Sequence, residues 1–326
     1  MQQIQATYAC PQQAVVVVTP IFEDIEASDR LFKELAATIG PRLYVVAVDD
    51  GSLRRPVEVD GLALAGIAGV VLRLKRNVGH QRAIAIGLNF VASCLEGFEC
   101  VVVMDSDGED VPQSVVPLLA ALQPLDVDVA VARRRNRAEA LRFRMFYLVY
   151  KVVFRLLSGR RIDFGNFMAL KPIGLRRLVA MQELWIHLAA CTLASRLRIA
   201  DCPLDRGPRY AGDSRMNFVS LVLHGFKALM VFAEDVLVRV GIACALIAGL
   251  AIVGAATAVL LKLIGYATPG WFSIALGILL LVFLQTGALT LMTLMLTGVV
   301  RGGSIASARW EEFIETISES HGHRAP

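Results

Sequence analysis

Four acidic side chains follow directly on a short apolar run, and together they could hold a metal ion. The run is Val-Val-Val-Met at residues 101–104. The carboxylates after it are those of Asp105, Asp107, Glu109 and Asp110. Such runs are typical of buried strands, and residues two apart point to the same side, so Asp105 and Asp107 can converge where α/β sheets bind ligands. Carboxylate oxygens suit Mg²⁺ or Mn²⁺, completed by waters and a substrate diphosphate. The same residues could instead form a solvated acidic turn before a helix from Val111.

Strand-like and helical patterns alternate through the first 132 residues, and they would position these carboxylates. The expected strands are residues 14–19, 43–48, 69–74, 100–104 and 127–132. The expected helices include residues 31–39, 83–91 and 115–122. Near-continuous apolar strands separated by helices predict a parallel sheet covered on both faces. Three successive strands end in polar, glycine-containing turns, which would meet at one edge of the sheet and form a site.

Five segments resemble one enzyme family. They are residues 19–24, 48–52, 76–83, 104–112 and 209–217. In order and spacing they are similar to the family 2 glycosyltransferases of GT-A fold, and in particular to the polyprenyl-phosphate branch that includes dolichol-phosphate mannose synthases and undecaprenyl-phosphate glucosyltransferases. The resemblance implies an α/β, Rossmann-like nucleotide-sugar domain over residues 1–217. The last segment is similar to the Arg-x-x-Gly-x-Ser-Lys/Arg motif of that branch.

The resemblance also implies roles for individual residues. The nucleotide-binding residues would be Pro20, Phe22, Asp24, Asp49, Asp50, Asn77, His80, Asp105 and Ser106. Asp105 and Asp107 would contact the Mg²⁺ or Mn²⁺ on the diphosphate, and Asp110 matches the acid of a Gln-Asp-Pro-Pro motif. Glu23, His80 and the segment 163–168 depart from the family pattern, which leaves the identity of the sugar open.

The same turns also have simpler interpretations. Asp49–Ser52 fits an ordinary turn with glycine at a positive φ, and His80 fits a structural hydrogen-bonding role. The turns contain neither GxGxxG nor GxxxxGK[ST], which disfavours a dinucleotide site and a P-loop.

The second third of the chain carries a basic segment. Residues 133–161 contain ten Lys or Arg and one acid, Glu139. Within them, residues 139–157 predict an amphipathic helix that lies in a bilayer interface, although an ordinary core-packed helix has a similar pattern. No nucleic-acid-binding motif accompanies the charge, so nucleic acid is not an expected partner.

The last third of the chain predicts a membrane anchor. Hydrophobic residues make up 56% of the chain and the mean hydropathy is +0.57, with the excess concentrated in residues 236–300. We expect a juxtamembrane helix at residues 218–235 and two transmembrane helices, at about 240–261 and 271–300, joined by a tight hairpin. The remaining residues, 301–326, are expected to form a polar tail that is partly disordered from Trp310 onward.

Charge and cysteine usage predict the orientation of this anchor. Arg301 and Arg309 after the second span, and the basic domain before the first, place both termini in the cytoplasm by the positive-inside rule. The six cysteines show no CxxC spacing, which indicates buried thiols in a reducing compartment. The polar residues 1–13 predict no cleaved signal peptide. We therefore expect an integral protein of the inner membrane with a cytoplasmic catalytic domain.

These features predict an inverting glycosyltransferase. A nucleotide-diphosphate sugar, of the UDP-glucose or GDP-mannose type, would donate its sugar to a polyprenyl phosphate at the cytoplasmic face. Arg133, Arg209 and Arg215 are candidates for holding the phosphate in line, because arginine binds phosphate bidentately.

Two alternatives stay open. One is transfer to a hydroxyl of a glycolipid or polysaccharide, for which Glu183 could act as the base. The other is a non-catalytic membrane scaffold with a degenerate transferase domain, although Asp105 and Asp107 are both present. A homo-oligomer is compatible with the spans, but they contain no GxxxG motif to specify one. The sequence assigns no role to His187.

Overall fold

The computed structural model describes residues 8, 10–134, 151–210, 218–266, 270–302 and 309–322. The chain forms two compact units. The sheet unit consists of Met1–Arg144, Ile162–Val231 and Ser307–Pro326. The hairpin unit consists of Met145–Arg161 and Phe232–Ala306. The sheet unit is therefore built from segments on both sides of the hairpin in sequence.

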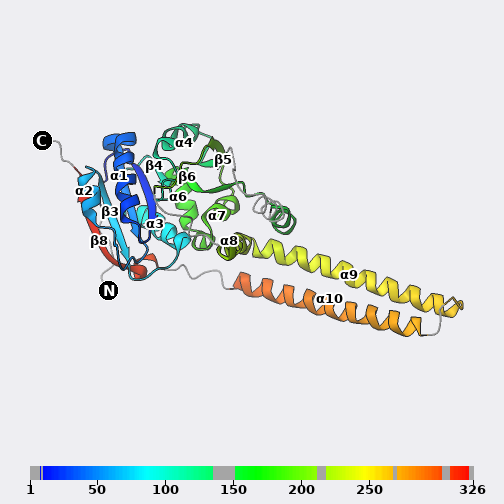
Figure 1. The fold of residues 1–326 in the computed structure, drawn as a ribbon. Coiled ribbons are helices and arrows are strands. Elements are labelled where there is room, and N and C mark those ends of the chain that lie inside the picture. The colour runs from blue at the N-terminus through cyan, green and yellow to red at the C-terminus, as the bar shows by residue number, and fades with distance from the viewer. Residues whose placement is uncertain are drawn as a thin grey trace. The chain divides into compact units, whose positions relative to one another are not determined.

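An eight-stranded sheet forms the centre of the sheet unit, with the order β7-β5-β6-β4-β1-β2-β3-β8 (Figure 1). The strands are β1 (Val15–Ile21), β2 (Leu43–Asp49), β3 (Ala68–Leu74), β4 (Cys100–Val103), β5 (Val129–Arg134), β6 (Phe164–Leu170), β7 (Ile199–Leu204) and β8 (Ile314–His321). The neighbours β4, β1, β2 and β3 are parallel, and β7 is parallel to β5. The carboxyl ends of the four parallel neighbours therefore meet at one edge.

Helices cover both faces of the sheet, as the alternating strand residues require. Val16 and Val18 of β1 point into a core shared with α3 (His80–Cys94), α6 (Pro172–Val179) and α7 (Leu188–Ala194). Val15 and Val17 point into a second core shared with α1 (Ile25–Ile39), α2 (Val59–Leu64) and α4 (Val115–Leu122). The period-2 pattern of β-branched residues thus gives a three-layer α/β/α arrangement.

The five predicted strands run parallel to one another, but the sheet also contains two antiparallel strands that the sequence did not predict, β8 at one edge and β6 in the interior. Strand β6 lies between β4 and β5 and is antiparallel to both. Its first half, Phe-Gly-Asn, has the composition of a loop rather than a strand, and only its last four residues are buried. Strand β6 was therefore not expected from the sequence.

Within the tail that was expected to be partly disordered, residues 310–321 form regular structure. A short 3₁₀ helix, Trp310–Phe313, leads into β8, which pairs antiparallel with β3. Trp310 and Ile314 are buried, and the ring of Trp310 contacts Phe90 of α3 edge-on at 5.9 Å. The segment is polar because β8 is the edge strand, whose outward side chains face solvent.

The helix α8 (Phe218–Val231) belongs to the sheet unit. The expected juxtamembrane helix at residues 218–235 is thus divided, because α8 ends at Val231 and the next helix begins at Ala233. Further short helices are the 3₁₀ turns Gly40–Arg42, Pro112–Ser114 and Gln182–Trp185.

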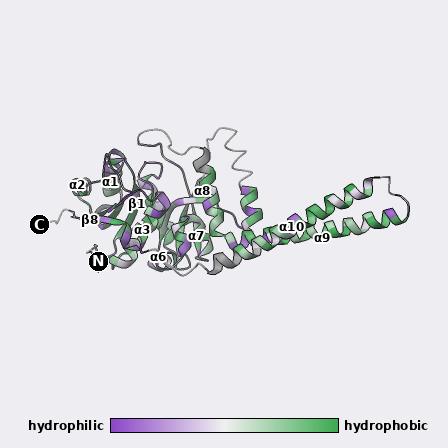
Figure 2. Ribbon diagram, turned by 90° about the horizontal axis from the view of Figure 1, so that it is seen from below, coloured by the Kyte–Doolittle hydropathy of each residue, from purple (hydrophilic) through white to green (hydrophobic). Residues whose placement is uncertain are grey.

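The hairpin unit contains α9 (Ala233–Leu263) and α10 (Trp271–Gly302), which pack side by side (Figure 2 shows their apolar composition). Residues 233–263 and 271–293 are long and apolar enough to cross a membrane. Residues 151–157 of the expected interfacial helix are helical, and Val152 and Leu156 are exposed there. Residues 139–150 lie outside the described part of the chain.

Candidate functional site

The carboxyl edge of the sheet brings together the loops that the sequence singled out. The loop after β4 carries Asp105 and Asp107, and it lies next to the end of β1, because the hydroxyl of Ser106 donates to the carbonyl of Pro20 at 3.3 Å. The loops after β2 and β3 are also joined by hydrogen bonds, because the carboxylate of Asp50 accepts from backbone N–H groups of the loop after β3. The polar turns therefore form one continuous surface.

The acidic loop, defined as residues 105–110, is held by its own carboxylates. The side chain of Asp110 accepts a hydrogen bond from the backbone N–H of Asp105 at 2.9 Å. Oδ1 of Asp107 accepts one from the N–H of Glu109 at 3.0 Å. Gly108 between them has φ 88°, and a Cβ there would lie 2.7 Å from the ring of Tyr210. The loop is thus a fixed turn with Asp105 and Asp107 on it.

A second segment, the strap (residues 205–210), covers this acidic loop. Nη2 of Arg209 lies 2.9 Å from Oδ2 of Asp107, and its Nε lies 3.0 Å from Oε1 of Glu109. Arg206 also pairs with Glu109. The N–H of Tyr210 donates to the carbonyl of Asp107 at 2.8 Å. Two arginines of the strap therefore neutralise part of the acidic cluster.

Asp49 and Asp50 are buried, and their carboxylates accept hydrogen bonds from backbone N–H groups. The carboxylate of Asp49 accepts from the N–H groups of Ser52 and Val57, at 2.9 and 3.1 Å. The carboxylate of Asp50 accepts from Val78 and Gly79, at 2.7 and 3.0 Å. These hydrogen bonds fix the loops that would surround a nucleobase. Direct contact of either carboxylate with the base stays a prediction.

Glu23, one of the departures from the family pattern, supports the same loop. Its carboxylate accepts from the backbone N–H groups of Leu53, Arg54 and Arg55. These backbone hydrogen bonds lower the pKa of the Glu23 carboxyl. Glu23 therefore shapes the loop after β2, a role that the sequence did not indicate.

His80 connects the acidic loop to the interior through a chain of amides. Its Nε2 lies 3.1 Å from Oδ1 of Asp105 and 3.1 Å from Nδ2 of Asn166. Gln81 donates to Asn166 at 3.1 Å and accepts from the N–H of Leu188 at 2.8 Å. Sequence reasoning gave Gln81 and Asn166 no role. Gln81 is a buried amide in the first turn of α3, between the polar residues His80 and Arg82, so its sequence context did not set it apart.

The remaining predicted nucleotide residues lie on the same edge. Pro20 is in β1, and Phe22 follows it with 41% of its surface exposed. Asp24 stands before α1 and makes no side-chain capping bond. Asn77 is exposed in the loop after β3. Phe22 and Asn77 are therefore accessible to a ligand at this edge.

The arginines predicted to hold phosphate have different surroundings. Arg133, at the end of β5, pairs with Asp201 at 2.7 Å and with Asp163 at 3.4 Å. Arg209 is bound to the acidic loop, as described above. Arg215 lies outside the described residues.

Burial and charge shift the pKa values of two site residues. Burial and the neighbouring Asp105 raise the pKa of Asp107 above its usual range, although Arg209 and Arg206 lower it. Burial lowers the pKa of His80, but the carboxylates of Asp105, Asp110 and Asp50 raise it by more. The acidic loop is therefore short of positive charge even with the strap arginines beside it.

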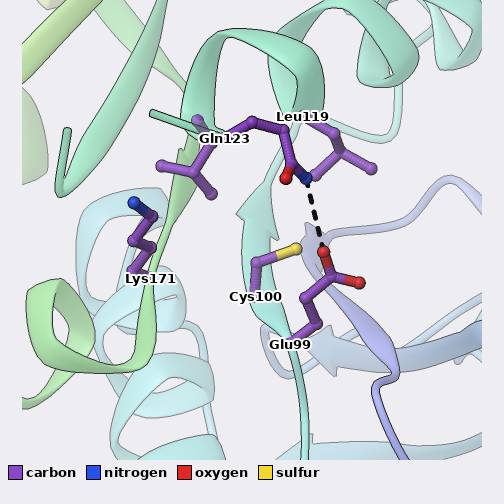
Figure 3. Close-up of a pocket in the computed structure, with 6 residues that line it drawn as sticks. Glu99, Cys100, Leu119, Gln123 and Lys171 are labelled. Carbon is purple, nitrogen blue, oxygen red and sulfur yellow. Dashed lines mark hydrogen bonds between the residues drawn. The ribbon is translucent and has the colours of Figure 1, made fainter. Parts of the chain in front are cut away.

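A small pocket of about 70 Å³ lies away from this edge, beside the first residue of β4 (Figure 3). It is lined by Glu99, Cys100, Leu119, Leu122, Gln123 and Lys171. Because Cys100 begins the strand whose other end leads to Asp105, this pocket is separate from the site described here.

The fold is that of an α/β protein with an acidic loop at the carboxyl edge of its parallel strands. The sequence profile of glycosyl transferase family 2 matches residues 16–184, just over half of the 326 residues, and the chain belongs to this family. The expected GT-A-type α/β domain followed by two apolar helices is thereby confirmed.

Two curated relatives are similar to this chain. One is the uncharacterized glycosyltransferase YkoT of Bacillus subtilis (strain 168), 23% identical over 297 residues, which are 84% of each chain. The other is the dodecaprenyl-phosphate galacturonate synthase of Rhizobium johnstonii, 28% identical over 161 residues. That match covers 46% of this chain and 45% of the relative.

Among solved structures, the chain is similar to glucosyl-3-phosphoglycerate synthase from Mycobacterium tuberculosis. Its complex with Mn²⁺, UDP and glucosyl-3-phosphoglycerate matches 70% of this chain and 80% of that one, with 16% identity and a TM-score of 0.48. Its complex with Mg²⁺ and UDP matches 72% and 87%, with 14% identity and a TM-score of 0.48.

Proposed function

We propose that this protein is a membrane-bound, inverting glycosyltransferase that moves a sugar from a nucleotide-diphosphate donor to a polyprenyl phosphate. The observation that carries the proposal is the acidic loop at the carboxyl edge of the parallel strands, in a chain that also has two helices apolar enough to span a bilayer. An acidic loop suits a metal-bound diphosphate donor, and spanning helices keep the enzyme at the membrane that contains a lipid acceptor. The similarity to a dodecaprenyl-phosphate galacturonate synthase supports the choice of acceptor.

The residues present fit a divalent cation. Asp105 and Asp107 offer carboxylate oxygens, and Mg²⁺ or Mn²⁺ commonly binds one or two carboxylates and completes its shell with waters and substrate phosphates. Burial and the neighbouring Asp105 raise the pKa of Asp107, and a cation bound between the two carboxylates would favour the charged form of Asp107. No group of three or more His, Cys, Asp or Glu in the described ranges could hold the ion alone, so the diphosphate would supply further oxygens. The bound cation would neutralise charge on the leaving nucleoside diphosphate.

The chemistry needs positioning more than proton transfer. An oxygen of the acceptor phosphate would attack the anomeric carbon while the bond from that carbon to the donor diphosphate breaks, so the nucleoside diphosphate leaves with the electron pair. The acceptor is already an anion at neutral pH and requires no general base. The carboxylate of Glu183, which a hydroxyl acceptor would need, forms no hydrogen bond to the described residues of the acidic loop.

The chain path supports a catalytic domain on one side of the membrane. Segments before and after α9 and α10 both belong to the sheet unit, because β8 pairs with β3. If the two helices span a bilayer, both of their outer ends are therefore on the side of the sheet. The arginines beside the spans favour the cytoplasmic side.

Transfer to undecaprenyl phosphate in detergent tests the proposal. Purified protein would be incubated with Mn²⁺ or Mg²⁺ and, in separate reactions, with radiolabelled UDP-glucose, UDP-galacturonate or GDP-mannose. We expect label in an acid-labile lipid product with one donor, and loss of that product in Asp107→Ala. The matched control is Asp126→Asn, an exposed carboxylate outside the site, which should keep full activity.

Two other outcomes would contradict the proposal. If the protein binds a nucleotide sugar but transfers the sugar only to a hydroxyl group, the acceptor is not a polyprenyl phosphate. A folded protein that binds no nucleotide at all would be a scaffold.

A further inference from the structure

The described arginines around the acidic loop are already paired with carboxylates. Arg209 pairs with Asp107 and Glu109, Arg206 pairs with Glu109, and Arg133 pairs with Asp201 and Asp163. Each would have to leave a carboxylate before it could bind a phosphate. An acceptor phosphate would therefore gain most from cationic or donor groups that the chain leaves unpaired.

One such donor lies on α8. Nε2 of His224 is 3.0 Å from Nε2 of His187, and the two rings lie 4.4 Å apart. Nδ1 of His187 accepts from the N–H of Ala190 at 3.3 Å, which leaves the proton of a neutral His187 on Nε2. His187 then donates to Nε2 of His224, so the proton of His224 is on Nδ1.

Both histidines are in surroundings that favour this neutral state. Burial and His224 lower the pKa of His187 to about 3. Burial, followed by His80 and Lys227, lowers the pKa of His224. No hydrogen bond of Nδ1 of His224 to the described residues is formed, so this N–H is a donor available to a ligand.

Continuous contacts join this donor to the catalytic centre. Asp105 contacts His80, and His80 contacts Asn166. Asn166 is bonded to Gln81, which accepts from the N–H of Leu188 beside His187. His187 in turn holds His224. The helix α8 is therefore anchored to the same polar network that contacts the acidic loop.

Lys227 adds a charge beside this donor. It stands three residues after His224, so the two side chains are neighbours on α8. Lys227 is exposed and makes no ion pair with the part of the chain that the structure describes. A flexible lysine of this kind can reach an anion as a compact point charge.

The adjacent strip of α8 is apolar and exposed. Leu223, Phe226 and Met230 are exposed by 55, 58 and 60%, and their spacing returns them to one side of the helix, roughly a quarter turn from His224 and Lys227. Only residue 232 separates α8 from the candidate span α9. A helix that joins a membrane span and exposes such a strip suits a bilayer interface.

We propose that His224 and Lys227 form the subsite that binds the phosphate of the lipid acceptor, while the apolar strip of α8 lies among the acyl chains. This inference rests on the proposed function and assigns its acceptor site to residues that neither the family pattern nor the sequence indicated. His187 is a positioning residue, which holds the His224 ring through its Nε2 and leaves Nδ1–H for the ligand.

A lysine and an N–H donor would also attract the headgroup of an ordinary anionic phospholipid. The experiment therefore compares undecaprenyl phosphate with such a phospholipid. Binding of the full-length protein would be measured in nanodiscs of phosphatidylcholine that contain undecaprenyl phosphate, undecaprenol or phosphatidylglycerol at equal mole fraction. The variants are Lys227→Met, Lys227→Arg and His224→Leu. The matched control is Lys33→Met, an exposed lysine on α1.

We expect binding to undecaprenyl phosphate but not to undecaprenol. Lys227→Met and His224→Leu should weaken that binding at least about tenfold, as for loss of a charge-assisted hydrogen bond. Lys227→Arg and Lys33→Met should bind within about threefold of wild type. Affinity for UDP or GDP, measured by calorimetry, should be unchanged in every variant, which also shows that the sheet unit is folded.

Three results would overturn the inference. If Lys227→Met binds undecaprenyl phosphate as wild type does, the subsite is elsewhere although the proposed function stands. If the variants lose phosphatidylglycerol binding to the same extent, the residues serve general headgroup attraction. If wild type does not distinguish undecaprenyl phosphate from undecaprenol, both the subsite and the proposed acceptor are wrong.

Discussion

The guanidinium of Arg209 is bound to the carboxylate of Asp107, with Nη2 and Oδ2 2.9 Å apart. The two residues are 102 positions apart in sequence, and Asp107 is one of the two carboxylates proposed to hold the divalent cation. A cation at Asp107 would compete with Arg209. Release of Arg209 on cation binding would place a free guanidinium beside the substrate phosphates.

This pairing predicts opposite effects of Arg209→Met on metal binding and on transfer. Without nucleotide, Mn²⁺ affinity should rise roughly two- to fivefold, the scale expected for loss of a partly exposed ion pair. Transfer should fall at least tenfold, because a phosphate contact is lost. Mn²⁺ titration followed by EPR measures the first effect, and initial rates measure the second. Arg206→Met, which leaves Asp107 paired, is the control, and weaker Mn²⁺ binding in Arg209→Met would contradict the competition.

Asp49 predicts a change in stability. Its carboxylate is fully buried and accepts from the N–H groups of Ser52 and Val57. Asp49→Ala would leave both donors without this partner and should lower the free energy of unfolding by about 2–4 kcal/mol. Asp49→Asn retains one acceptor oxygen and should lose less. Thermal unfolding in detergent, followed by circular dichroism, measures the difference, and an unchanged midpoint in Asp49→Ala would show that the loop does not depend on these bonds.

His187 predicts a pH dependence of stability. Burial, with His224 beside it, lowers its pKa from 6.5 to about 3 in the folded chain. The unfolded chain therefore binds more protons between these values, and stability falls as the pH decreases from about 6.5 toward 3. Between pH 7 and pH 5 the loss should be roughly 2 kcal/mol.

His187→Asn is the matched variant for this effect. Asparagine can still cap α7 at the position where Nδ1 accepts from Ala190, but it does not titrate. Its melting temperature should fall less than that of wild type when the pH is lowered from 7 to 5. Equal slopes for the two proteins would exclude His187 as the source.

Trp310 predicts that the end of the chain stabilises the sheet unit. Its ring is 6% exposed and packs against Phe90. Trp310→Ala should destabilise the sheet unit by about 3–5 kcal/mol, as for other large-to-small changes in a core. Trp271→Ala, at the start of α10 with 43% of its surface exposed, should leave the melting of the sheet unit unchanged. A melting temperature unaffected by Trp310→Ala would restore the view of a dispensable tail.

Local patterns determined much of this protein. Apolar β-branched runs located β1 to β5, and helix α4 begins and ends at the predicted residues, Val115 and Leu122. Two long apolar stretches located α9 and α10. The acidic loop was evident because charge follows a buried strand abruptly. These features depend on composition and periodicity over fewer than about 30 residues, which a single sequence displays directly.

Only the tertiary structure decided which polar groups meet. No local pattern indicated that Arg209 would pair with Asp107, that Gln81 would bridge Asn166 and Leu188, or that His187 would contact His224. Strand β8 likewise pairs with β3, from which it is at least 240 positions away in sequence. Such contacts form where a strand edge or a buried polar group still lacks a hydrogen-bond partner after the rest of the chain has packed. Which groups these are depends on the whole fold, so no local sequence pattern predicts the contacts.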